Sequence, residues 1–225
     1  MIFDNIYMSH KVNPKAFRIK EITDWSFRGF YGKKPSAELK IDSKIRDFLK
    51  EKLANMAVEK VETEGLREKM NIIITSARPG LIIGRGGGGI EELKKKLESF
   101  LKIKDSASPI KELRIEVKEI KDPWSSASLI AQLIAQQIEK RMPFRRVLKQ
   151  TLDKIAVYKT IQGARIELSG RLDGASIARR EWLKKGKLPL QTIRADIDFA
   201  KAEAHCSYGA VGIKVWLYKG EKFEK

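Results

Sequence analysis

The feature that most constrains this sequence is a glycine-rich loop, Gly84-Arg85-Gly86-Gly87-Gly88-Gly89, between a short apolar segment and a run with helical spacing. Glycine has no Cβ atom, so the loop leaves its backbone amides open and can adopt positive φ angles that other residues disfavour. The helix predicted after the loop adds the partial positive charge of its N-terminus. The loop therefore predicts an anion-binding site, with phosphate as the natural ligand.

The segments around this loop predict a small α+β domain, because helical and strand-like patterns follow one another along them. The predicted elements are, in order, a helix from Ser43 to about Met56, strands over 58–64 and 71–76, a short helix after Pro79, the glycine loop, a helix over 90–101 and a strand over 114–119. This is the helix–strand–strand–helix–helix–strand order of the type II KH domain, whose GxxG loop clamps an RNA backbone.

Two nucleotide-binding motifs are alternatives for the glycine loop. Gly84-x-Gly86-x-x-Gly89 has the spacing of the dinucleotide-binding fingerprint, but that fingerprint follows a strand directly, whereas here a Pro-Gly pair ends the strand several residues earlier. A Walker loop requires Gly-Lys followed by Ser or Thr, which this loop lacks. The context therefore favours a KH clamp over a cofactor site. The clamp residues are Gly84, Arg85, Gly86 and Gly87.

The second half of the chain predicts a further α+β domain. Asp122-Pro123 is predicted to cap a helix with a buried stripe up to Met142, because Asp suits the N-cap and Pro suits the first helical position. The other predicted elements are a helix over 144–158, strands over 165–169, 192–199 and 211–218, and a helical stretch over 175–184, with a short helix or turn over 24–40 near the start. The predicted division is a basic arm and lead-in over 1–42, the KH domain over 43–120, the second domain over 121–219 and a short tail over 220–225.

The charge balance predicts a polyanionic partner, a nucleic acid or an anionic membrane surface. The 225 residues include 46 Lys and Arg against 29 Asp and Glu, a net charge of +17 that repels itself unless phosphates or solvent ions neutralise it. Three groups of cations are predicted to contact RNA phosphates. They are Lys11, Lys15 and Arg18 in the arm, Arg145, Arg146 and Lys149 within one turn of a predicted helix, and Arg165, Arg171, Arg179 and Arg180 in the following stretch.

Few residues suit catalysis or metal binding. Cys206 is the only cysteine, so it cannot form an internal disulfide, and the two histidines cannot complete a zinc site with it. Asp196 and Asp198 alternate on a predicted strand and could hold a divalent metal for phosphodiester cleavage, but a solvated strand face explains the same pattern. We expect no cofactor, no metal and no export signal or membrane span, and we expect the reducing cytoplasm as the location.

Phrases along nearly the whole chain resemble the bacterial-type small ribosomal subunit protein 3 family. The phrases are Lys11-Val12-Asn13-Pro14, Ala77-Arg78-Pro79-Gly80, Ile83-Gly84-Arg85, Phe144-Arg145-Arg146-x-x-Lys149-Gln150, Ser169-Gly170-Arg171-Leu172, Ile177-Ala178-Arg179, Glu181-Trp182, Pro189-Leu190, Arg194-Ala195-Asp196-Ile197-Asp198, Glu203-Ala204-His205, Tyr208-Gly209 and Lys214-Val215-Trp216. Because so many independent phrases occur in one order, chance is a poor explanation of the similarity.

The resemblance implies an N-terminal type II KH domain and a C-terminal α+β domain, seated in the head of the small ribosomal subunit against rRNA. It also implies that the protein lines the mRNA entry channel, where Arg145, Arg146 and Lys149 match the family residues that contact incoming mRNA and help to unwind it. The implied neighbours are small-subunit proteins 10 and 14 in the head and 4 and 5 at the channel, with no membrane and no small-molecule substrate. The family clamp usually has a second basic residue where this chain has Gly86.

Two other functions stay open at this point. One is an RNA-processing enzyme with Asp196 and Asp198 as metal ligands, and the other is a free KH-type regulator of transcription or mRNA. The preferred hypothesis is a non-enzymatic, structural RNA-binding protein of the ribosome, because the sequence carries no motif for nucleotide hydrolysis.

Overall fold

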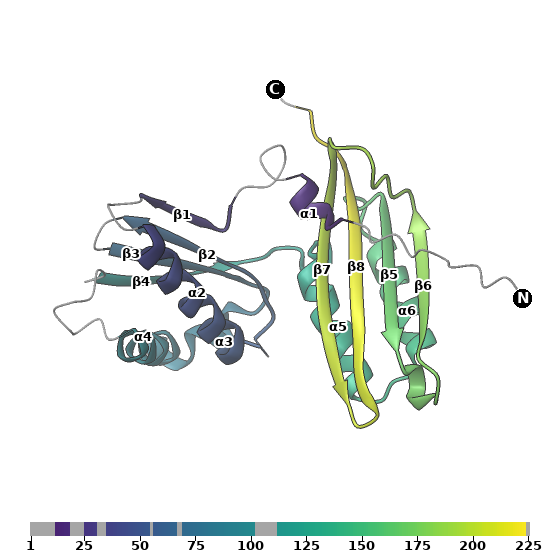
Figure 1. The fold of residues 1–225 in the computed structure, drawn as a ribbon, viewed down its shortest axis with the longest axis horizontal. Coiled ribbons are helices and arrows are strands. Elements are labelled where there is room, and N and C mark those ends of the chain that lie inside the picture. Colours follow the sequence, from purple (N-terminus) through teal and green to yellow (C-terminus); the bar gives the residue numbers. More distant parts are fainter. Residues whose placement is uncertain are drawn as a thin grey trace, which may run out of the picture.

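Two α+β domains, each built on a four-stranded sheet, lie side by side in the computed structural model (Figure 1). The structure describes residues 12–18, 25–30, 35–54, 56–66, 69–101 and 112–223. The two-domain α+β prediction is confirmed. None of the described helices is both long enough and apolar enough to cross a lipid bilayer.

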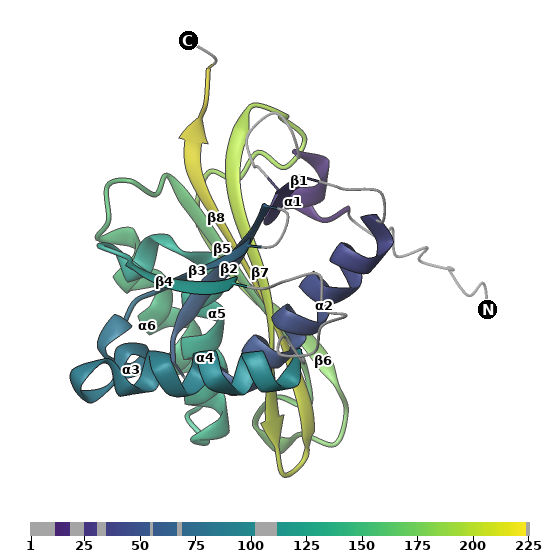
Figure 2. The same ribbon diagram turned by 90° about the vertical axis from the view of Figure 1, so that its left-hand side faces the viewer.

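The first domain packs three helices against one face of its sheet (Figures 1 and 2). Its elements are β1 Phe27–Phe30, α2 Pro35–Lys52, β2 Val58–Leu66, β3 Lys69–Ser76, α3 Pro79–Ile83, the 3₁₀ turn η1 Arg85–Gly87, α4 Gly88–Phe100 and β4 Glu112–Glu119. The strands follow in the order β1-β2-β3-β4, with β2 and β3 antiparallel and the two outer pairs parallel. From α2 to β4 the elements follow the predicted type II KH order.

Apolar side chains from every layer of the first domain meet in one core. Ile45 and Leu49 of α2, Ile72 of β3 and Leu97 of α4 are completely buried there. Their helical and strand-like spacings are the patterns from which these elements were predicted, so periodicity alone locates this core.

Two predictions for the first domain are wrong. The helix predicted over 43–56 runs from Pro35 to Lys52, because Pro35 suits a helix start and the chain must turn before β2. The segment predicted as a short helix or turn over 24–40 contains β1, which pairs in parallel with β2. A four-residue strand is too short to show a periodic pattern, and its pairing depends on residues more than thirty positions away.

The second domain covers one face of an antiparallel sheet with two helices, which lie behind the sheet in Figure 1. Its elements are α1 Pro14–Phe17, the 3₁₀ turn η2 Pro123–Ser125, α5 Ala127–Glu139, α6 Phe144–Ala156, β5 Gly163–Gly170, the 3₁₀ turn η3 Leu172–Gly174, β6 Arg179–Gly186, β7 Ala195–Cys206 and β8 Gly209–Glu221. The strand order is β6-β5-β8-β7. Ile134 of α5, Val147 of α6, Ile166 of β5 and Val215 of β8 are fully buried between the layers.

The helical stretch predicted over 175–184 is wrong, because residues 179–186 form the edge strand β6. Most side chains of β6 are exposed, so the alternation of Trp182 on one face and Leu183 on the other is hidden among charged residues. The strand predicted from Thr192 begins at Ala195 and extends to Cys206.

The cap predicted for the first long helix of the second domain is also wrong. Asp122 precedes only the short turn η2 and makes no side-chain capping bond, and α5 begins at Ala127. The backbone N–H of Ala127 donates to Oδ2 of Asp198 at 2.8 Å, so a residue of β7 caps this helix. A cap that lies 71 positions away leaves no signal in the local sequence.

Candidate nucleic-acid interface

The glycine loop joins α3 to α4 with a geometry that requires glycine at two positions. Gly84 has φ +70° and ψ −178°, and a Cβ atom added to it would lie 2.9 Å from the Gly89 nitrogen. A Cβ atom on Gly89 would lie 2.6 Å from the carbonyl oxygen of Ile82. Since real Cβ atoms do not approach backbone so closely, these two residues hold the ends of α3 and α4 together.

The middle of the loop is open. Gly86 and Gly87 have positive φ angles, and Cβ atoms added to Gly86, Gly87 or Gly88 would meet nothing within 4 Å. The exposed Arg85 lies at the start of this stretch, and the apolar side chains of Leu81 and Ile83 are exposed beside it. The predicted clamp therefore combines open backbone, one cation and apolar surface, which is the set of groups that an extended RNA strand can use.

The predicted helix cations lie together on α6. Arg145, Arg146 and Lys149 are all exposed, whereas Val147 and Leu148 on the other side of the helix are buried in the core. Among the described residues, none of these three cations forms an ion pair. Their charge is therefore not neutralised within the part of the chain that the structure describes.

The first turn of α6 is fixed by the turn η3. The backbone N–H of Phe144 donates to Oδ1 of Asp173 at 3.2 Å, and Asp173 itself has φ +54°. The guanidinium carbons of Arg145 and Arg179 lie 5.7 and 5.4 Å from the centroid of the Phe144 ring. These contacts hold the cationic face of α6 in place, and nothing in the local sequence near Phe144 indicates the Asp173 cap.

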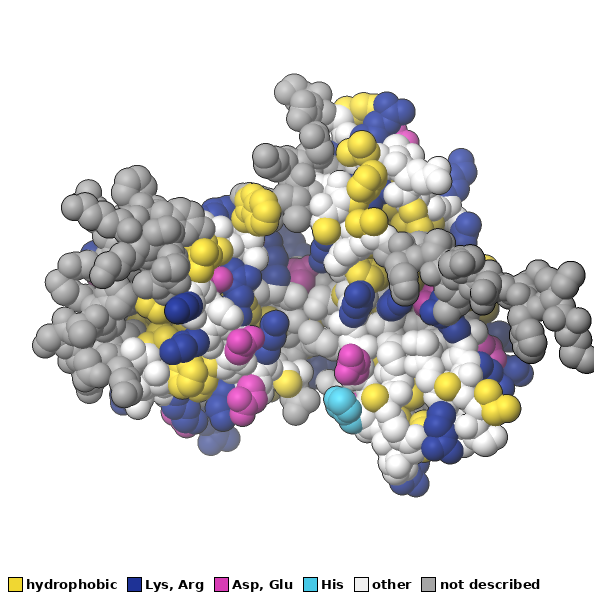
Figure 3. Space-filling view, viewed as in Figure 1, with side chains coloured by type: hydrophobic (Ala, Val, Ile, Leu, Met, Phe, Trp, Pro, Cys, Tyr) yellow, Lys and Arg dark blue, Asp and Glu magenta, His cyan; other side chains and the backbone are white. Residues whose placement is uncertain are grey.

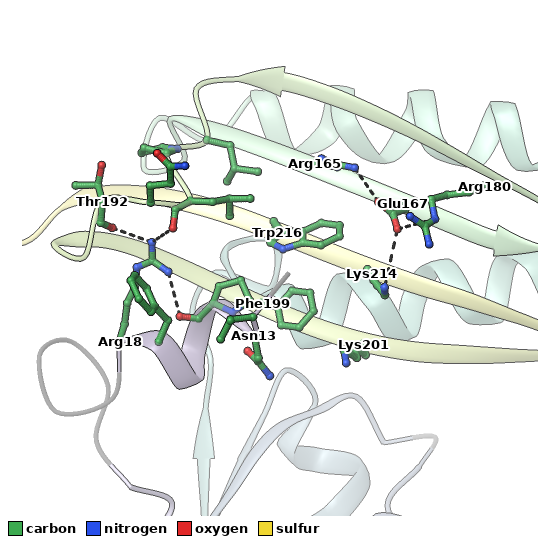
Figure 4. Close-up of a pocket in the computed structure, with 17 residues that line it drawn as sticks. Asn13, Arg18, Arg165, Glu167, Arg180, Thr192, Phe199, Lys201, Lys214 and Trp216 are labelled. Atoms are coloured by element: carbon green, nitrogen blue, oxygen red, sulfur yellow. Dashed lines mark hydrogen bonds and ion pairs between the residues drawn. The ribbon is translucent and has the colours of Figure 1, made fainter. Parts of the chain in front are cut away.

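Two of the three arm cations predicted to contact RNA, Lys15 and Arg18, bind other residues of this chain. Lys11 lies outside the described residues. Arg18 is only 1% exposed, and its Nη2 atom donates to the carbonyl oxygens of Leu190 and Thr192, each at 2.8 Å (Figure 4). Lys15 forms an ion pair with Asp198 at 2.8 Å. The described part of the arm is thereby bound to the second domain.

The four predicted patch residues lie in three places and do not form one patch. Arg165 and Arg180 lie on the sheet face that α5 and α6 do not cover, where both contact Glu167 (Figure 4). Arg171 donates to the carbonyl oxygens of Ala175 and Tyr208 at 2.8 and 3.2 Å, beside η3. Arg179 pairs with Glu181 and lies beside α6. Only Arg179 therefore lies with the α6 cations.

Asp196 and Asp198 have separate structural partners, which speaks against the metal-dependent nuclease. Asp196 pairs with Lys222 at 3.0 Å, while Asp198 pairs with Lys15 and caps α5. Within the ranges that the structure describes, no three His, Cys, Asp or Glu side chains gather as metal ligands.

The electrostatics of Asp198 match this structural role. Burial alone raises the pKa of its carboxyl, but Lys15, the Ala127 amide and Lys219 outweigh burial and hold the pKa below its usual value. The carboxylate is therefore ionised at neutral pH, and it is one of the residues whose role sequence reasoning missed.

Comparison with known proteins gives one consistent result. A family model described as KH domain matches residues 44–125, and one described as Ribosomal protein S3, C-terminal domain, matches residues 134–217. The chain is 45% identical over 214 residues to the small ribosomal subunit protein uS3 of Desulfitobacterium hafniense, which covers 95% of this chain and 94% of that protein. It is 44% identical over 218 residues to uS3c of Pyropia yezoensis, with 95% and 90% covered.

Proposed function

This chain belongs to the small ribosomal subunit protein uS3 family, and from that membership we propose that it lines the mRNA entry channel and contacts incoming mRNA through Arg145, Arg146 and Lys149. As a family member it is a structural, RNA-binding component of the small ribosomal subunit and not an enzyme. The observation that carries the proposal is the exposed cation cluster on α6, which no described acidic residue neutralises.

The way in which α6 is held supports a role in opening mRNA. A cation cluster that acts on RNA by electrostatics must hold its charges at fixed positions while the strand moves past. The buried face of α6 and the Asp173 cap supply that rigidity. The α6 cations would attract the phosphates of one strand of an mRNA hairpin and so favour the separated strands, with no hydrolysis step.

The glycine loop and the other cations complete the proposed RNA contacts. Arg85 and the loop backbone at Gly86 and Gly87, which no side chain covers, would hold rRNA in the head. Further rRNA contacts would come from Arg165, Arg171, Arg179 and Arg180. Lys15 and Arg18 would contribute by holding the arm on the second domain, and Lys11 would contact rRNA directly. The proposed protein neighbours are small-subunit proteins 10 and 14 in the head and 4 and 5 at the channel, and the proposed location is the ribosome of the cytoplasm.

The test compares small subunits that carry the R145A/R146A/K149A variant with wild-type subunits during translation of an mRNA with a stable hairpin. We expect the rate of movement through the hairpin to fall several-fold, because three phosphate contacts are lost, while an unstructured mRNA is translated at the wild-type rate. The matched control K44A/K50A/K52A removes three exposed cations from α2 and should leave both rates unchanged. Hairpin opening at the wild-type rate by the α6 variant would refute the proposal.

A further inference from the structure

The sheet face of the second domain that α5 and α6 leave uncovered carries cations and aromatic rings in register. Arg165 lies opposite Lys184 of β6 and Trp216 of β8. In the next row of the same face, Glu167 lies opposite Trp182 and Lys214, and Lys214 lies opposite Lys201 of β7. We call this surface the outer face. Lys and Arg side chains are spread over the same side of the second domain in Figure 3.

A stack of side chains holds an exposed indole ring on the outer face. The guanidinium carbon of Arg165 lies 4.6 Å from the ring centroid of Trp182 and 5.2 Å from that of Trp216. Trp216 is 9% exposed and lies within the sheet surface on β8, whereas Trp182 on the edge strand β6 is 52% exposed. An aromatic ring that is fixed by a cation and half exposed provides a surface on which a planar group can stack.

The outer face has an excess of positive charge. The side chain of Glu167 is only 6% exposed, and it faces Arg165 at 2.8 Å, Arg180 at 3.4 Å and Lys214 at 4.0 Å. One carboxylate therefore faces three cations. Lys184 and Lys201 add two more, and neither forms an ion pair within the described part of the chain. Glu203 lies two residues after Lys201 on the same face and adds only one negative charge.

A groove of about 980 Å³ runs beside this cluster, between the sheet, α1 and residues 188–192 (Figure 4). One part of its lining is apolar, with Phe17, Leu188 and Phe199, and the other part is cationic. A groove with both kinds of surface can take a ligand that has both a planar apolar part and an anionic part. Nucleotides in a single strand have this composition, because every base has a stacking face and every linkage has a phosphate.

We propose that the outer face binds single-stranded RNA, with a base stacked on Trp182 and phosphates on Arg180, Lys201 and Lys214. This inference rests on the RNA-binding role proposed above and adds a surface separate from the glycine loop and α6. Four-stranded sheets that stack unpaired bases on aromatic side chains are an established solution for recognising RNA. Glu167 acts as a positioning residue, because it fixes Arg165, and through Arg165 the indole ring.

The first experiment measures binding of the full-length chain to a fluorescent 12-nucleotide oligouridylate. W182A should weaken binding about five-fold or more, while W182F, which keeps an aromatic ring, should bind within about two-fold of wild type. The K201A/K214A variant should lower the slope of log affinity against log salt by about 1.4, because each lost phosphate contact on a single strand is worth about 0.7. The control K50A/K52A should leave the slope unchanged. Equal binding by W182A and wild type would overturn the proposal.

The second experiment identifies the occupant in the assembled particle. A photoreactive benzoylphenylalanine replaces Trp182, the variant is built into small subunits, and irradiation is followed by mass spectrometry of the cross-link. Cross-linking to RNA supports the proposal, whereas cross-linking only to another protein, or to nothing, overturns it. The entry-channel proposal is tested separately, by hairpin opening in the R145A/R146A/K149A subunits, which keep Trp182. A failure of this proposal is thereby distinct from a failure of the entry-channel proposal.

Discussion

At the scale of single residues, the sequence predicts the glycine loop but not which of its glycines the fold requires. Six residues with five glycines identify a loop with open backbone, and the surrounding spacing identifies the KH domain. Which glycines are essential depends on the approach of α3 to α4, because Gly84 and Gly89 face backbone atoms and Gly88 faces open space. That approach is a property of the folded domain, so the local sequence cannot indicate it.

The first prediction compares two neighbouring glycines of α4. Gly89→Ala should destabilise the first domain by about 1–3 kcal/mol, because the new Cβ atom would overlap the Ile82 carbonyl oxygen. Gly88→Ala should stabilise it by about 0.4–1 kcal/mol, because Gly88 has helical angles and free space, and alanine restricts the unfolded chain. Urea denaturation of both variants measures the two effects. Changes of the same sign would contradict this account of the loop.

At the scale of elements, strong periodicity gives reliable predictions and long-range pairing does not. The helices α5 and α6 and the strands β3 and β5 were predicted because their apolar residues recur with a clear period over at least five positions. β1 and β6 were mispredicted, since one is short and the other is an exposed edge strand. The α6 cations were correctly placed on one exposed side of a helix, whereas the roles of Asp173 and Asp198 depend on contacts between distant elements.

The second prediction separates the two roles of Asp198. Asp198→Asn keeps an oxygen that can accept from the Ala127 amide but removes the charge, while Asp198→Ala removes both. We expect D198A to cost about 1 kcal/mol more stability than D198N, which is the usual worth of an N-cap. The coupling with Lys15 in a double-mutant cycle should be about 1 kcal/mol or less, because the Lys15 side chain is 44% exposed. Equal losses in D198A and D198N would show that Asp198 does not cap α5.

The third prediction gives the pH dependence of the same carboxylate. The pKa of Asp198 is lower in the folded protein than in the unfolded chain, so its contribution to stability is present above pH ~4. The contribution is lost as the pH falls through the folded pKa. The stability difference between wild type and D198N should therefore be constant from about pH 5 to 7 and shrink below pH ~4. A difference that grows on acidification would contradict the depressed pKa.

At the scale of the whole molecule, the first described segment of the chain belongs to the second domain. Residues 12–18 pack against β7 and residues 190–192, so the first domain is inserted between the arm and the rest of the second domain. The sequence predicted a basic arm whose cations contact RNA phosphates, because nothing in the arm itself indicates a binding site within the chain. The domains also touch directly, where Nε2 of Gln132 in α5 donates to the Val58 carbonyl oxygen at 2.7 Å.

The fourth prediction tests this arrangement through Arg18. Arg18→Ala should destabilise the second domain by about 1.5–3 kcal/mol, because it removes the charged hydrogen bonds of a buried guanidinium group to the carbonyl oxygens of Leu190 and Thr192. Arg18→Lys should recover only part of the loss, since an ammonium group lacks the fork that bridges two carbonyls. Hydrogen exchange followed by mass spectrometry should show weaker protection in β8 and unchanged protection in β3. Equal loss of protection in both sheets would contradict the assignment of the arm.

The insertion of the first domain also determines the order in which the two domains can fold during synthesis of the chain. Arg18 is made 172 residues before Leu190, so at translation rates of about 5–20 residues per second it waits roughly 10 to 35 seconds for its partner. The first domain is complete once β4 has left the ribosome, and it can fold during that interval. The glycine loop can therefore bind RNA before the residues that bind the arm have been synthesised, and the second domain folds last.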